Sequence, residues 1–283
     1  MKICKILSLS GAGSLLSLEL GIIASLFNNK QYDYNFDIIS GISSGGLISS
    51  FLSYYDNIIE GIDDLKNILE NINNDDVYKK DILKIYNRWS IYDTYPLENT
   101  LKKILLNKTN LTNNDRITLL ASVNMESLLL NIYEFKNLNF SQKIKVLMAS
   151  TAIPFLFPPI QIDNKYYIDG GMISNELIFQ SLRYKNCDSY EILYIGAFNR
   201  FNYKNISSLN DYSNRLLQLI FNTFNNELYD ILNINCSYPI GKITMCNSNY
   251  DKLNEYSILD FNQGKKLFEI GYNYNQCKDI IFC

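Results

Sequence analysis

The sequence predicts an α/β fold with a mainly parallel central sheet flanked by helices. Short β-rich runs end in glycine-rich turns, amphipathic helical patterns follow them directly, and this strand, turn and helix pattern occurs twice within the first 52 residues. Successive β–α units favour parallel strands with helices packed on the sheet. Ligands are then expected at the carboxyl ends of the strands.

The first two units place both of their turns at one edge of the predicted sheet. A strand over residues 3–9 leads through the turn Ser-Gly-Ala-Gly-Ser over 10–14 into a helix, in which leucine and isoleucine recur at helical spacing up to residue 26. The second unit has a buried strand over 36–39, a tight turn over 41–46 and a helix whose apolar face includes Leu47, Ile48, Phe51 and Leu52.

The chain from about 57 to 106 is predicted to be a helical insertion. Isoleucine and leucine form a helical stripe between residues 58 and 72, and shorter stripes lie around 82–85 and 97–105. Periodicity leaves open whether this insertion is a lid over a site or a cover for one face of the sheet.

The rest of the chain continues the mixture of strands and helices. Prolines exclude a helix over residues 153–159, which are predicted to form a loop. The other predicted elements are strands over 117–123, 128–135, 165–168, 191–195 and 242–246, and helices over 142–150, 177–184, about 212–232 and 264–274. Because no internal repeat or linker divides the 283 residues, we expect a single domain over 1–283.

The composition excludes several kinds of site. The chain has no histidine, so it holds no Ser-His-Asp triad, Cys-His dyad or histidine-ligated metal, and we expect neither a metal nor another cofactor. Lys and Arg number 26 against 29 Asp and Glu, for a net charge of -3. Without a basic excess, we expect no nucleic-acid partner.

The six cysteines include no C-x-x-C pair, so we expect reduced thiols in a reducing compartment. The first residues lack the features of a secretory signal, and no stretch approaches 18 uninterrupted apolar residues. The expected location is therefore intracellular, either soluble or peripherally associated with a membrane.

The sequence Gly41-Ile42-Ser43-Ser44-Gly45 is a G-x-S-x-G motif between a predicted strand and a predicted helix. In that setting the glycines permit a sharp turn that exposes the Ser43 hydroxyl, and the helix that follows presents free N–H groups to a developing oxyanion. The alternative is a glycine-serine turn with no chemistry. Without histidine, a serine nucleophile needs a lysine or a carboxylate as its base.

Asp169 is the best candidate base, because it ends a strand and is followed by Gly170 and Gly171. An Asp-Gly-Gly sequence is also often a plain turn. A third motif, Gly11-Ala12-Gly13, offers successive backbone N–H groups at a helix N-terminus. Such a loop binds either the phosphate of a nucleotide or an oxyanion, and a Walker lysine is absent.

Taken together, these three motifs resemble the patatin-like phospholipase family. The segment Ala149–Pro159 is similar to the family's A-S-x-A-x-P-x-x-F-P-P sequence, Asn175 matches an asparagine after the D-G-G, and residues 259–272 look like a family ending. The resemblance implies a patatin-like three-layer fold in which Ser43 is the nucleophile, Asp169 its only catalytic partner, and the amides of Gly11, Ala12 and Gly13 the oxyanion hole. It also implies a phospholipid or other acyl-ester substrate and contact with a lipid interface.

The glycine loop departs from the family pattern. Leu15 stands where the family usually has Arg or Lys, and Leu16 where it has Gly. Loss of the cation weakens contacts with phosphate or slackens the loop. A catalytically weak or silent lipid-binding protein is therefore the alternative, with a nucleotide-binding module as a third hypothesis. Phe155, Leu156 and Phe157 are candidates for an acyl channel or a lipid interface, or else for plain core packing.

Overall fold

A nine-stranded sheet lies at the centre of the computed structural model, which describes residues 1–29, 35–81, 89–108, 115–197 and 239–281. Its strands are β1 (Ile3–Leu9), β2 (Ile38–Ile42), β5 (Ile117–Asn124), β6 (Leu130–Glu134), β7 (Ile160–Ile162), β8 (Lys165–Asp169), β9 (Ser189–Ile195), β10 (Ile240–Ser248) and β11 (Asn275–Ile281). They follow the order β11-β10-β9-β1-β2-β5-β8-β7, with β6 also paired to β5.

The sheet is mainly parallel, as the sequence predicts. Strands β10, β9, β1, β2 and β5 run parallel to one another, whereas β6, β7, β8 and β11 pair in antiparallel fashion. Side chains of β1 alternate between the two faces: Leu7 and Leu9 belong to one buried cluster, Cys4 and Ile6 to another. Both faces are therefore covered, as expected for a parallel sheet.

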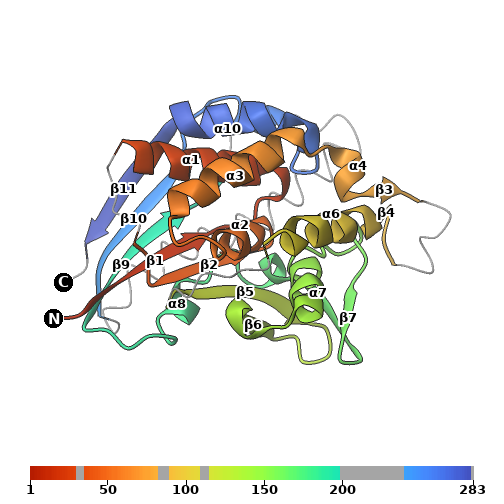
Figure 1. Ribbon diagram of the computed structural model, residues 1–283, viewed down its shortest axis with the longest axis horizontal. Helices are drawn as coiled ribbons and strands as arrows, with labels where there is room; N and C mark the ends of the chain where they lie inside the picture. The colour runs from red at the N-terminus through yellow and green to blue at the C-terminus, as the bar shows by residue number, and fades with distance from the viewer. Residues whose placement is uncertain (30–34, 82–88, 109–114, 198–238, 282–283) are drawn as a thin grey trace.

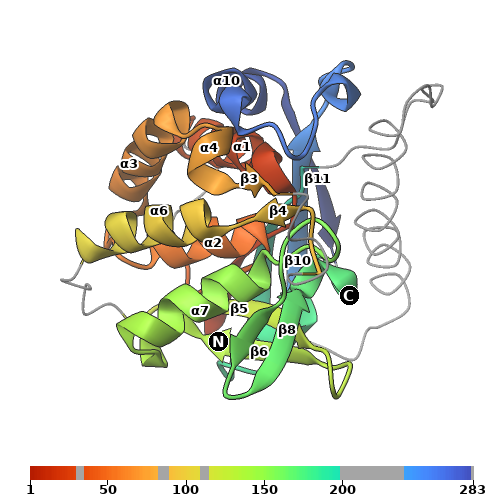
Figure 2. The ribbon, with the colours of Figure 1, turned by 90° about the vertical axis from the view of Figure 1, so that its right-hand side faces the viewer.

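Six helices gather on one side of the sheet (Figures 1 and 2). They are α1 (Leu16–Asn28), α2 (Ser44–Leu52), α3 (Ile58–Asn71), α6 (Tyr95–Leu106), α7 (Phe140–Ser150) and α10 (Gly264–Asn273). On the other face, the short helix α8 (Ile178–Ser181) packs against β1 and β2. The predicted class, a sheet flanked by helices, is confirmed.

Residues 57–106 contain α3 and α6, together with α4 (Asn74–Val77) and a two-stranded ribbon of β3 (Lys79–Lys80) and β4 (Tyr92–Asp93). The apolar stripe at 97–105 lies within α6, and the segment 153–159 is not helical. The stripe at 82–85 and the helix predicted over 212–232 lie outside the described residues. In the part that is described, no helix is both long and apolar enough to cross a membrane.

Two disulfides correct the expectation that the cysteines are reduced. Cys4 is bonded to Cys187, and Cys246 to Cys277. The partners are 183 and 31 residues apart in the chain, so a search for C-x-x-C spacing does not find them. Sheet pairing brings them together, because Cys246 and Cys277 lie opposite each other on β10 and β11.

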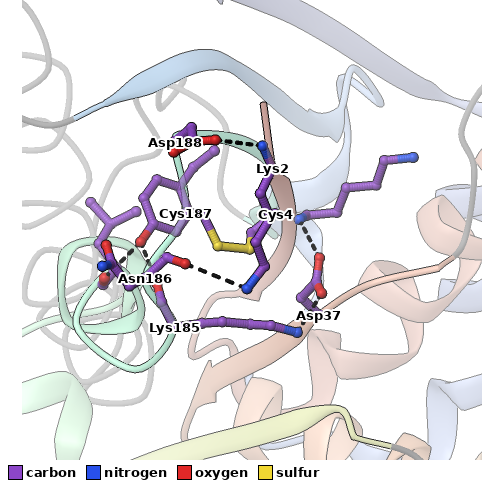
Figure 3. Close-up of a disulfide and its surroundings, with 10 residues drawn as sticks. Lys2, Cys4, Asp37, Lys185, Asn186, Cys187 and Asp188 are labelled. Carbon is purple, nitrogen blue, oxygen red and sulfur yellow. Dashed lines mark hydrogen bonds and ion pairs between the residues drawn. A yellow bond between two sulfur atoms is a disulfide. The ribbon is translucent and has the colours of Figure 1, made fainter.

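Cys187 comes just before β9, the parallel neighbour of β1, and charged groups surround its bond to Cys4 (Figure 3). The Lys2 amide donates to Asp188 Oδ2 at 2.6 Å, and Lys185 Nζ lies 2.6 Å from Asp37 Oδ1. The first contact fastens the start of β1 to the segment before β9, and the second fastens that segment to the residue before β2. Persistent disulfides are typical of oxidising environments, which removes the basis for expecting a reducing compartment.

Candidate active site

Ser43 lies at the sharp turn between β2 and α2. Its backbone has φ 51° and ψ -122°, a left-handed conformation that non-glycine residues seldom adopt. A Cβ atom at Gly41 would collide with the Gly45 carbonyl, and one at Gly45 would collide with the carbonyl of Ser10. The glycines of the motif are therefore required by close backbone packing, and this strained turn has the local form of a nucleophile elbow.

The structure brings the Ser43 and Asp169 side chains together across 126 residues of sequence. Ser43 Oγ donates a hydrogen bond to Asp169 Oδ2 at 2.6 Å, and Asp169 Oδ1 accepts one from the Gly171 amide at 2.7 Å. Asp169 ends β8, where it pairs with Ser122 of β5, the strand next to β2. Because β8 runs antiparallel to β5, its last residue, Asp169, lies close to the carboxyl end of β2.

Burial controls the acidity of Asp169. The side chain has no exposed surface, and removal of the carboxylate from water raises the pKa of Asp169 to about 7. The hydrogen bonds from Ser43 and from the Gly171 amide oppose this rise because they favour the charged form. A carboxylate with a pKa near neutrality is a far better proton acceptor than an exposed one.

In the glycine loop, two of the three amides assigned to the oxyanion hole donate to side chains. The Gly11 amide donates to Asn175 Oδ1 at 3.0 Å, and the Ala12 amide donates to Ser44 Oγ at 2.8 Å. The third residue, Gly13, lines the same pocket as Ser43. An oxyanion can therefore accept hydrogen bonds from all three amides only if the side chains of Asn175 and Ser44 are displaced.

Hydrogen bonds to residues 257 and 258 hold the loop, and position 15 does not carry the cation that is usual in the family. Ser14 donates through its amide to the Ile258 carbonyl at 2.8 Å and through its hydroxyl to the Ser257 carbonyl at 2.9 Å. Gly13 has φ +58°, and a Cβ there would collide with the Ile258 carbonyl. Leu15, at the position of the family's cation, is buried in the core.

Glu19 supports the residue before the loop. Its side chain in α1 has no exposed surface, and its Oε1 accepts a hydrogen bond from Ser10 Oγ at 2.5 Å. Ser10 Oγ in turn accepts from the Ala197 amide at 3.3 Å. Burial raises the pKa of Glu19 well above its usual range. One buried carboxyl therefore ties the ends of β1 and β9 to the first helix.

An apolar pocket extends from Ser43 into the helical layer. Leu16, the second departure from the family pattern, is part of its wall. Beside the serines and threonines, its wall is formed by Leu16, Leu47, Ile48, Phe51, Leu65, Ile68, Leu69, Ile72, Val77, Leu97, Leu101, Ile104, Leu105, Leu147, Ile153, Phe157, Ile258, Leu259 and Phe261. The helices α3 and α6 of the insertion thus form much of the wall of a pocket that Ser43 also lines.

The three aromatic and aliphatic candidates after Pro154 have different positions. Phe157 lines the pocket, and Leu156 is buried in the core beside it. Phe155 is 81% exposed and points away from the core. Of these three residues, Phe157 is therefore the one that occupies the position predicted for an acyl channel.

Comparison with known proteins places the chain in a family. A family model described as "Patatin-like phospholipase" matches residues 7–180, which is more than half of the chain. The chain belongs to the patatin-like phospholipase family. The family groups lipid acyl hydrolases, and the matched residues include the glycine loop, Ser43 and Asp169.

Two further proteins resemble this member of the patatin-like family. The uncharacterized protein R571 of Acanthamoeba polyphaga mimivirus is 25% identical over 179 residues, which cover 60% of this chain and 59% of that protein. The match thus spans about three-fifths of the viral relative. The crystal structure of VipD from Legionella pneumophila aligns with a TM-score of 0.44 and 14% identity, covering 98% of this chain and 68% of VipD.

Several supporting residues were not assigned a role from the sequence. Ser150 Oγ accepts a hydrogen bond from the Ser43 amide at 3.1 Å, and Ser44 Oγ accepts from Ala12. The doubled serine in the G-x-S-S-G turn and the serine of the A-S-T-A segment are the only local signals for them. Within the described ranges, no group of three or more acidic or cysteine side chains is arranged to hold a metal ion.

Proposed function

We propose that the protein is a serine-dependent lipid acyl hydrolase that works through Ser43 and Asp169 and a covalent acyl-enzyme. The observation that carries this proposal is the 2.6 Å hydrogen bond between Ser43 Oγ and Asp169 Oδ2 at the head of an apolar pocket. The pocket suits a fatty-acyl chain, because apolar walls exclude water from the substrate. Its walls range from residue 13 to residue 261, which favours one domain over the whole chain.

In the first half of the reaction, Ser43 Oγ attacks the ester carbonyl while Asp169 accepts the hydroxyl proton. The carbonyl oxygen becomes an oxyanion, stabilised by the Gly13 amide and by the Gly11 and Ala12 amides once their side-chain acceptors are displaced. Collapse of this intermediate breaks the bond to the alcohol, and Asp169 returns the proton to the leaving oxygen. Ser43 then carries the acyl group.

In the second half, water attacks the acyl-enzyme and Asp169 accepts a proton from it. Collapse of the second tetrahedral intermediate releases the fatty acid and restores the Ser43 hydroxyl, which takes the proton back from Asp169. The pKa of Asp169 near 7 suits both roles, since the group gains and loses a proton in each cycle at neutral pH.

A fluorophosphonate probe, which phosphonylates activated serines, tests the proposal. We expect labelling of the wild type and of the control Ser53→Ala. The control removes a hydroxyl at the C-terminal end of α2, the helix that follows Ser43. Labelling should be absent in Ser43→Ala and slower by about a hundredfold or more in Asp169→Asn, the usual contribution of a general base. Labelling that persists in Ser43→Ala would refute the assignment of the nucleophile.

A silent lipid-binding protein is the second candidate. It is favoured by one observation: the Gly11 and Ala12 amides already donate to Asn175 and Ser44. If the loop keeps these bonds, the oxyanion loses two donors, each worth about 3 kcal/mol. This alternative predicts a wild-type protein that binds fatty acid but neither reacts with the probe nor hydrolyses any ester.

A further inference from the structure

Six large exposed apolar side chains belong to segments around β4, β7 and β8, and we call them the patch. In Figure 1, β4 and β7 lie at the end of the ribbon away from the N-terminus. The patch consists of Trp89, Met125, Leu128, Leu129, Phe155 and Tyr166. Single exposed apolar residues are ordinary, but a contiguous group of this kind marks an interaction surface.

Contacts join the separate segments that carry these side chains. The rings of Trp89 and Tyr166 are 5.4 Å apart, and the Met125 amide donates to the Tyr166 carbonyl at 2.9 Å. The Ile91 amide donates to the Phe155 carbonyl at 2.9 Å, which joins the residues before β4 to the loop after α7. Leu128 and Leu129 lie in the turn between β5 and β6, just beyond Met125.

Three of these exposed residues have a positive φ. Trp89, Leu128 and Phe155 have φ of 57°, 57° and 66°, and their side chains are 59%, 71% and 81% exposed. Bulky residues avoid this left-handed region, and strained backbone persists where the surrounding structure enforces it, commonly at functional sites. Core packing does not explain the strain, because none of the three side chains is buried.

One residue of the patch, Phe155, lies on the outer side of a segment that lines the Ser43 pocket. Ile153 and Phe157 face into the pocket, whereas Phe155 between them faces out. The carbonyl of Ala152 accepts a hydrogen bond from the Asp169 amide at 3.0 Å, so the same segment also contacts the proposed base. A lipid surface that covers the patch therefore lies next to the pocket that receives its acyl chain.

We propose that this patch docks the protein on a neutral phospholipid surface. The proposal rests on the proposed function, since a lipid hydrolase meets its substrate at such a surface. Tryptophan and tyrosine suit the boundary between headgroups and acyl chains, because each combines an apolar ring with a polar group. Among the described residues next to Met125 and Tyr166, Lys165 and Glu126 approach to 3.8 Å and offset each other's charge. The net charge of -3 also disfavours an anionic surface.

Phosphatidylcholine vesicles test the docking without any turnover. The full chain carrying Ser43→Ala is used, so that no lipid is cleaved, and Trp89 is the reporter because it is the only tryptophan in the sequence. We expect vesicles to shift its emission to shorter wavelength, equally in 0.1 M and 0.5 M salt. Electrostatic binding would weaken at the higher salt.

The variant Phe155→Asn with Leu128→Asn removes apolar surface and keeps the reporter. Asparagine tolerates a positive φ, so the fold is preserved. We expect vesicle partitioning to fall by about tenfold or more, since burial of one such side chain alone changes an equilibrium constant by about that factor. The matched control Ile281→Asn changes an exposed residue on β11, which is at the opposite end of the sheet from β7, and should bind as before.

Several results overturn the docking proposal: no shift of Trp89 emission, equal partitioning of the double variant and the control, or binding that needs anionic lipid and disappears in salt. Self-association through the patch, seen as a dimer that the double variant abolishes, overturns it as well. Hydrolysis of a dissolved short-chain ester is measured in parallel for the wild type and for the double variant with Ser43 intact. If the wild type does not hydrolyse this ester, the proposed function is refuted. The vesicle result is judged independently, because it uses the Ser43→Ala protein, which cleaves no lipid.

Discussion

The acidity of Asp169 predicts how activity depends on pH. Ser43 can lose its proton to Asp169 only when the carboxylate is ionised, and burial raises the pKa of Asp169 from its usual 3.8 to about 7. The ionised fraction is then about one-tenth at pH 6 and about one-hundredth at pH 5. We expect kcat/KM to rise about a hundredfold between pH 5 and pH 8, with unit slope below pH 7. An exposed aspartate would leave it flat over this range.

The same shift affects stability in the opposite sense. Because the folded protein binds this proton more tightly than the unfolded chain, the stabilisation is complete below about pH 4 and is lost as the pH rises through about 7. The difference between the two pKa values corresponds to about 4 kcal/mol. Asp169→Asn removes the titration and retains an acceptor for the Gly171 amide. The variant should therefore gain stability relative to wild type between pH 4 and pH 8, while it loses activity.

Two assays check this prediction. Release of acid from a dissolved ester is followed by chromatography from pH 5 to pH 8, so that the readout itself does not titrate. Urea unfolding of wild type and Asp169→Asn is compared at pH 5 and pH 8. A flat activity profile, or a stability difference between the two proteins that does not change with pH, would show that Asp169 does not titrate near 7.

Three other changes have defined outcomes. Glu19→Leu leaves the buried Ser10 hydroxyl without its acceptor, so it should lower kcat and reduce the free energy of unfolding by about 1–3 kcal/mol. Glu19→Gln should restore both quantities. Steady-state kinetics and urea unfolding measure these effects. Cys4→Ser with Cys187→Ser should cost about 2–4 kcal/mol of unfolding free energy, and a reducing agent should then have less effect than on wild type. Gly13→Ala should cost at least about 1 kcal/mol and most of the activity, because of its positive φ and the collision with the Ile258 carbonyl; normal probe labelling would contradict this.

The parts of the fold that the sequence predicts well are those with a local signal. Residues 3–9 form β1 with the predicted bounds, and the helix after the Gly-Ala-Gly turn begins at Leu16. The G-x-S-x-G turn also has its cause within a few residues, because Gly41 and Gly45 are packed against nearby backbone. The local pattern makes Asp169 only the best candidate base, and its pairing with Ser43, 126 residues away, is strengthened by the family resemblance.

Features that depend on distant pairing were missed. The cysteines of each disulfide become neighbours only through the strand order, which no local spacing reveals. Periodicity likewise could not choose between a lid and a cover for the insertion, because the inward stripe of α3 is the same in both cases. The contribution of Ile68 and Leu69 to the Ser43 pocket depends on where the helix is placed.

The anchoring of the glycine loop by Ser257 and Ile258 makes the site sensitive to changes far away in the sequence. These two residues lie well beyond the segment 7–180 that defines the family, yet they hold the loop beside the nucleophile. A change that displaces residues 257 and 258 should therefore loosen the glycine loop by removing both hydrogen bonds of Ser14, and the bond from the Ala12 amide to Ser44 would remain. The geometry around the proposed nucleophile thus depends on a contact that spans 243 residues of sequence.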